Sequence, residues 1–187
     1  AMRAVVKKYP DDLDAATLFA ESLMMLRPWQ LWTADGKPAP GTLELVAVLE
    51  SVLKRNPHHP GANHFYIHAV EASPNLERAI PSAERLMTLV PGAGHLVHMP
   101  GHIFLQTGDY ELAAQTNVNA SEADRSYVER TGATGMYPLM YYNHNVHFES
   151  YAASMAGQYA RAKRTADKLT ANVSPYIAEM PMVVLPM

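Results

Sequence analysis

Apolar side chains recur along this chain at helical spacing. Ala, Leu, Met and Glu return three and four residues apart throughout, and no segment alternates apolar and polar residues between turn dipeptides. The pattern therefore predicts an all-α fold with almost no strand. The apolar stretches fall short of the roughly 20 residues that cross a bilayer, so we expect a soluble chain without a membrane partner.

A repeat underlies the helical pattern. Pro57 and Pro91 lie 34 residues apart, and His64 and His98 are separated by the same number of residues. A period of this length is typical of stacked helical hairpins.

Two similar segments carry the most specific signal. T-G-D-Y-E-L-A at 107–113 and A-G-Q-Y-A-R-A at 156–162 each place a glycine, a tyrosine and an alanine at matching positions. Here the sequence resembles the tetratricopeptide repeat (TPR) family, whose units are two antiparallel helices. The resemblance implies one domain over residues 1–187, an α-solenoid whose helical hairpins stack in a right-handed superhelix. Its repeats would span about residues 13–57, 60–91, 94–125 and 143–175.

Two insertions interrupt this period, at about 27–41 and 128–142. Both have loop chemistry, and long loops in repeat arrays often bind ligands or partners. Five aromatic residues lie in or beside them. They either pack the loops onto the repeats or form the wall of a ligand site: Trp29, Trp32, Tyr137, Tyr141 and Tyr142.

Longer segments extend the resemblance. R-P-W-Q-L-W-T, H-P-G-A-N-H-F-Y-I-H-A-V-E-A-S and H-L-V-H-M-P-G-H-I are similar to segments of longer, uncharacterised bacterial TPR proteins. This implies a piece of such a protein and brings no activity with it. Because neither end has the polar face that caps a solenoid, we expect self-association or only marginal stability, with Val183, Val184 and Leu185 contributing.

Seven of the nine histidines fall into three groups with helical spacing. Within each group the spacing of three, four or seven residues places the rings on one face, and the opposite face is apolar or small. We therefore expect the histidines to face away from the core. The groups are His64 and His68, then His95, His98 and His102, then His144 and His147.

In TPR proteins the first helices of the repeats line a concave groove. The resemblance therefore implies that all seven histidines, with Glu71 and Tyr151, converge on one surface, with Glu21 at its edge. The sequence departs from a regular helix at Pro100, where we expect a kink between His98 and His102. His58 and His59 lie in the turn between the first two repeats, and we interpret both as solvated loop residues.

Clustered imidazoles need partners for their ring nitrogens, and a metal ion supplies one. Imidazole with carboxylate suits Zn, Cu, Fe, Ni or Mn. Two other interpretations stay open, a cationic pocket for an anion at mildly acid pH and a hydrogen-bonded scaffold. No sequence motif indicates an organic cofactor.

Composition narrows the partners further. The chain has no cysteine. Its 15 basic and 18 acidic residues give a net charge of -3, which disfavours nucleic acid as a partner. The compartment stays open between cytoplasm and periplasm.

Three functions remain. The first is a groove that binds a metal and a small or peptide ligand, with or without catalysis. In it Glu71 or Glu21 acts as a base or an extra metal ligand, and Tyr151 orients the substrate or supplies a proton. Trp29 and Tyr142 would add ligand contacts. The second is a protein interaction scaffold without metal. The third is a groove filled by the rest of its own chain. No motif names a reaction class, so the sequence leaves enzymatic activity open.

Overall fold

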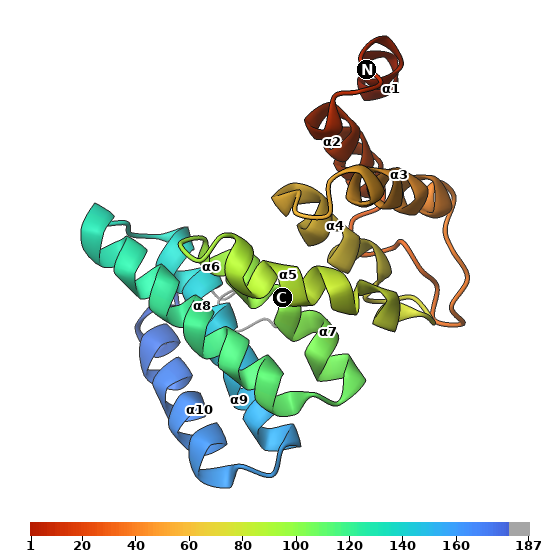
Figure 1. Ribbon diagram of the computed structural model, residues 1–187. Helices are drawn as coiled ribbons and strands as arrows, with labels where there is room; N and C mark the ends of the chain where they lie inside the picture. Colours follow the sequence, from red (N-terminus) through yellow and green to blue (C-terminus); the bar gives the residue numbers. More distant parts are fainter. Residues whose placement is uncertain (180–187) are drawn as a thin grey trace. The chain divides into compact units, whose positions relative to one another are not determined.

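The computed structural model describes residues 1–179, and these residues form helices and no strand (Figure 1). The only extended pairing among them is an isolated bridge between Trp32 and Pro38. The predicted all-α class is confirmed. Val183, Val184 and Leu185 lie outside the described residues. Within residues 1–179 no helix combines the length and the apolar character needed to cross a membrane.

The chain divides into two compact units, and the boundary falls between Leu89 and Val90. The helices of the first unit are α1 (Met2–Lys8), α2 (Leu13–Met24), α3 (Thr42–Arg55), α4 (Pro60–Val70), the short 3-10 helix η1 (Leu76–Ala79) and α5 (Ile80–Leu89). Each helix from α2 to α5 packs on the next, because each turns a stripe of apolar residues toward its neighbours. Leu45, Leu49, Ile67 and Leu86 are fully buried between them.

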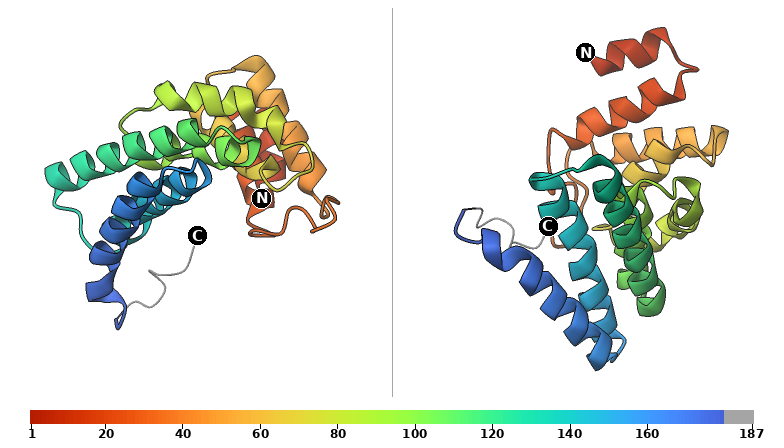
Figure 2. Two further views of the ribbon diagram at one scale, coloured as in Figure 1. Left: turned by 90° about the horizontal axis from the view of Figure 1, so that it is seen from below. Right: turned by 90° about the vertical axis from the view of Figure 1, so that its left-hand side faces the viewer.

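The second unit contains α6 (Gly94–His98), α7 (Pro100–Thr107), α8 (Tyr110–Thr131), the π-helical segment η2 (Tyr137–Tyr142), α9 (Asn143–Met155), α10 (Tyr159–Val173) and the 3-10 turn η3 (Ser174–Tyr176). α9 packs against both α8 and α10, and α6 and α7 pack against α8 (Figure 2). Met99, Ile103 and Val146 are buried in this unit.

Two turns of the second unit have the same geometry. Gly108 and Gly157 take positive φ angles of 89° and 73°, which end α7 and α9. In both turns the next amide donates to the carbonyl oxygen five residues earlier over 2.9 Å, from Asp109 to Phe104 and from Gln158 to Ala153. The two similar sequence motifs therefore build equivalent turns.

The predicted repeats each contain at least two helical segments, but one insertion differs from expectation. Residues 27–41 are irregular, as predicted, whereas 128–142 holds the end of α8 and the whole of η2. This second segment takes helical structure because it packs on α8 and α9. The single domain and the superhelix remain predictions.

Candidate functional site

Three histidines of the second unit come together from three helices. His98 ends α6, His102 lies in α7, and His144 lies in the first turn of α9. Each offers one ring nitrogen such that all three nitrogens lie within 4.8 Å of one another. The Nε2 atoms of His98 and His102 are 2.8 Å apart, and the ring centroids of His98 and His144 are 4.6 Å apart. We call these residues the histidine triad.

The helix is interrupted beside Pro100, and the kink predicted there stays a prediction. The helix stops after His98 and resumes at Pro100, with Met99 between them at φ -51° and ψ -37°. Proline has no amide hydrogen to continue the helical ladder, but Met99 keeps helical backbone angles. Because of this, His98 and His102 remain one turn apart on the same side, and their rings meet.

The His98 ring is held by a buried amide. Its Nδ1 lies 2.7 Å from Oδ1 of Asn117, and the Asn117 Nδ2 donates to the Ala113 carbonyl oxygen over 2.7 Å. This second bond fixes the amide so that oxygen faces the ring, and an oxygen can only accept. His98 therefore carries its proton on Nδ1, and Nε2 presents a lone pair toward His102.

His98 corrects the expectation that the histidines face away from the core. Its exposed fraction is 0%, because Asn117 of α8 gives its ring a polar partner inside the unit. Burial, together with the charges that His102 and His144 can carry, holds the pKa of His98 well below its usual range. The ring is therefore neutral near pH 7, which is the form that binds metal ions.

An aromatic wall borders the triad. The Phe148 ring centroid lies 4.7–4.8 Å from those of all three triad histidines. His95 stacks 6.0 Å from His98 and meets the Tyr141 ring edge-on at 5.6 Å. The predicted ligand His147 lies further along α9 and is not part of the triad.

A buried carboxylate lies beside this site, and sequence reasoning missed it. Asp124 of α8 accepts hydrogen bonds from the Tyr137 hydroxyl (2.6 Å) and the Asn145 amide (2.7 Å). Burial raises the pKa of Asp124, although both hydrogen bonds act in the opposite direction. A Cβ atom added to Gly94 would lie 1.9 Å from Asp124 Oδ1, so the glycine lets α6 approach this carboxylate. Asp124 thereby links η2 and α9 near the positions of Tyr141 and His144.

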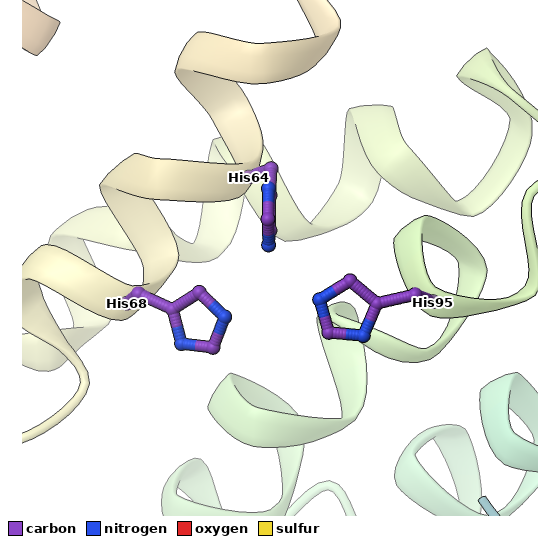
Figure 3. Close-up of side chains that lie close together, drawn as sticks. All are labelled: His64, His68 and His95. Atoms are coloured by element: carbon purple, nitrogen blue, oxygen red, sulfur yellow. The ribbon is translucent and has the colours of Figure 1, made fainter. Parts of the chain in front are cut away.

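In the first unit, α4 carries the pair His64 and His68, whose ring centroids are 5.0 Å apart (Figure 3). The figure also labels His95, which belongs to α6. The His68 Nδ1 lies 2.9 Å from Glu71 Oε1, and both side chains are largely buried. The Trp29 indole and the His68 ring meet edge-to-face, with ring centroids 6.0 Å apart. The structure therefore brings four predicted site residues together within this unit: His64, His68, Glu71 and Trp29.

His59 was wrongly interpreted as a solvated residue, whereas His58 is exposed as predicted. The His59 ring is buried and caps α4, since its Nδ1 accepts from the Ala62 amide over 3.2 Å. Its Nε2 lies 3.1 Å from Asp14 Oδ1. Pro60 at the first position of the helix was the available signal, because the residue before such a proline is the N-cap.

The remaining predicted ligand contacts are dispersed within their units. Tyr151 is exposed on α9, Glu21 is partly buried on α2, and Tyr142 lies beneath the Lys168 ammonium at 5.1 Å. Because the predicted common groove would draw on both units, it stays a prediction.

Three imidazoles and an adjacent aromatic wall can bind a transition metal ion and leave part of its coordination sphere for another ligand. Comparisons with protein-family models, with curated proteins and with solved structures gave no match for the chain.

Proposed function

We propose that the chain is a TPR-like helical repeat protein whose second unit binds a transition metal ion through His98, His102 and His144. The ion would then hold a small or peptide ligand at its remaining coordination positions. Equivalent turns at Gly108 and Gly157 support the repeat architecture. The contact between the triad nitrogens supports the metal site.

The observation that carries the proposal is the orientation of His98. Metal-binding histidines usually donate their second ring N–H to a neighbouring acceptor, which fixes the tautomer and the ring plane. Asn117 is such an acceptor, and it directs the His98 Nε2 to within 2.8 Å of the His102 Nε2. Nitrogens bound to one tetrahedral ion at about 2.0–2.1 Å are roughly 3.3 Å apart, so the rings need to separate by about half an ångström.

The donor set indicates which ions fit. Imidazole nitrogen suits Zn, Cu, Ni and Fe, whereas Mn also accepts nitrogen but favours oxygen donors. Three neutral ligands leave the ion its full positive charge, so an anionic group or a polarised water fits the open position. Such an ion supplies Lewis acid chemistry, and Phe148 gives a bound ligand an apolar surface.

The test is metal analysis of the full chain purified without a polyhistidine tag, followed by zinc titration in competition with a chromophoric chelator. Because His98 is buried and its loss can impair folding, His102→Ala and His144→Ala are the main variants. His147→Ala is the matched control, since His147 lies on the same helix as His144 but outside the triad.

We expect both triad variants to bind at least tenfold more weakly at this site and His147→Ala to bind like the parent. Equal binding by all three variants would refute the triad. Helical circular dichroism of each variant checks that it is folded.

One observation favours a protein interaction scaffold as the second candidate. The end of α2 and the following loop expose three large apolar side chains close together in sequence, Met25, Leu26 and Trp29, the last with 82% of its surface exposed. Such residues are typical of contact surfaces. If the full chain binds no metal, this interpretation becomes the first.

A further inference from the structure

The helix α4 presents a second set of metal-binding groups, which the triad does not use. His64 and His68 are one turn apart, and their ring centroids lie 5.0 Å apart on the same side of the helix (Figure 3). A histidine pair with this spacing can bind one ion with two nitrogens, because residues i and i+4 of a helix are neighbours. The helix thus fixes half of a coordination sphere before any ion binds.

Glu71 supplies the orienting group for this pair. Its Oε1 lies 2.9 Å from Nδ1 of His68, and the two side chains are only 16% and 14% exposed. A carboxylate can only accept from a neutral imidazole, so this contact places the His68 proton on Nδ1 and the lone pair on Nε2. The arrangement of carboxylate, imidazole N–H and opposite lone pair is the one that metal-binding histidines use.

Trp29 lies at the border of the same pair. Its ring centroid is 6.0 Å from that of His68, although most of the indole is exposed. Its backbone has φ 61°, in the left-handed region that a bulky residue rarely adopts. In this conformation the indole meets the His68 ring edge-to-face while most of the Trp29 side chain stays exposed.

From these contacts we propose that α4 holds a second divalent transition metal site, in which His64 and His68 bind the ion and Glu71 positions His68. The site does not depend on the proposed triad. Two imidazoles leave several coordination positions to water or to an anionic ligand. Among divalent ions of the first transition row, Cu²⁺ binds nitrogen ligands most tightly, and it is therefore the probe of choice.

The chain contains a reporter for this site. Its two tryptophans, Trp29 and Trp32, both contact α4 or the residues on it, since the Trp32 indole donates to the Ala69 carbonyl oxygen over 2.7 Å. Bound Cu²⁺ quenches indole fluorescence at short range. Titration of the full, tag-free chain with Cu²⁺ at pH 7.5 therefore follows binding at α4.

We expect saturable quenching that excess EDTA reverses. His64→Ala and His68→Ala should each shift the midpoint at least tenfold toward higher Cu²⁺ concentration. Glu71→Gln, which keeps a hydrogen-bond acceptor without the charge, should shift it less. His58→Ala is the matched control, because His58 is an exposed histidine of the same unit, and it should titrate like the parent.

His102→Ala separates this site from the triad. In this variant Cu²⁺ should quench the tryptophan fluorescence with the parent's midpoint, while the number of bound ions per chain falls by one. If quenching is unchanged in His64→Ala and His68→Ala, the second site is refuted and the triad is unaffected. If the parent binds only one ion per chain, and both His64→Ala and His102→Ala abolish that binding, two separate sites do not exist and the inference is overturned.

Discussion

Replacing Asn117 by alanine tests how the triad is built. The Asn117 side chain is fully buried and accepts the Nδ1–H of His98. Its loss leaves this N–H without its partner in the core, which costs about 1–3 kcal/mol of the free energy of unfolding. The Ala113 carbonyl still accepts from the Thr116 hydroxyl, so the penalty falls mainly on His98.

The same substitution should weaken metal binding. Loss of an orienting partner typically lowers metal affinity by 10–100-fold. At a free zinc concentration about 100 times the parent's Kd, the ion stabilises the parent by about 2.7 kcal/mol. For Asn117→Ala the same concentration is only about 1–10 times Kd, so the stabilisation falls to about 0.4–1.4 kcal/mol.

Urea unfolding with EDTA and with buffered zinc measures both effects. Asn117→Asp provides the contrast, because a carboxylate still accepts from Nδ1 and makes His98 a stronger ligand. We expect this variant to be less stable without metal, since it buries a charge, but to retain zinc stabilisation. If Asn117→Ala gains as much from zinc as the parent does, Asn117 does not orient the ligand.

Three further substitutions or conditions probe the same unit. In Gly101→Ala the new Cβ would lie 2.6 Å from the Asn117 Nδ2, so we expect urea unfolding to show about 1–3 kcal/mol less stability, together with weaker zinc binding. The control Gly92→Ala has nothing within 4 Å of its Cβ and should match the parent. Asp124→Ala removes the acceptor of two hydrogen bonds and should cost at least about 1 kcal/mol, with a change in the near-UV tyrosine dichroism; an unchanged urea midpoint would contradict this. The low pKa of folded His98 means that the unfolded chain binds more protons below about pH 6.5, so the stability of the metal-free chain should fall from pH 7.5 to 5.5, less steeply in His98→Asn.

The parts of the fold that the sequence predicted correctly depend on local signals. The turns at Gly108 and Gly157 follow from a residue that tolerates positive φ placed between two helical patterns. The break at Pro100 follows from a missing amide hydrogen. Neither depends on contacts with distant parts of the chain, so residue type and spacing suffice.

The predictions that failed depend on distant contacts. Residues 137–142 become helical while the Tyr137 hydroxyl is bonded to Asp124, 13 positions away in sequence. His98 is buried because Asn117 reaches it from another helix. The two glycine turns lie 49 residues apart in sequence. At this offset the position equivalent to Asn117 is occupied by Ala166, which has no polar side chain.

That difference explains why equivalent histidines take different roles. By the same offset His98 corresponds to His147 and His95 to His144. Only the position facing an amide can bury its imidazole with both nitrogens satisfied, so His98 becomes the centre of the triad. His144 joins it across the helices, whereas His147 remains partly exposed outside it.

The tautomers of the triad also indicate how an ion would enter. Since His98 keeps its proton on Nδ1, its Nε2 accepts a hydrogen bond from the Nε2 of His102 across 2.8 Å. An ion that binds both nitrogens must replace this bond, which is worth about 1 kcal/mol, and His102 must move its proton to Nδ1. The His98 ring is already neutral, so the exchange releases no proton from His98. The hydrogen bond therefore preserves the triad's geometry before an ion binds and lowers its affinity only modestly.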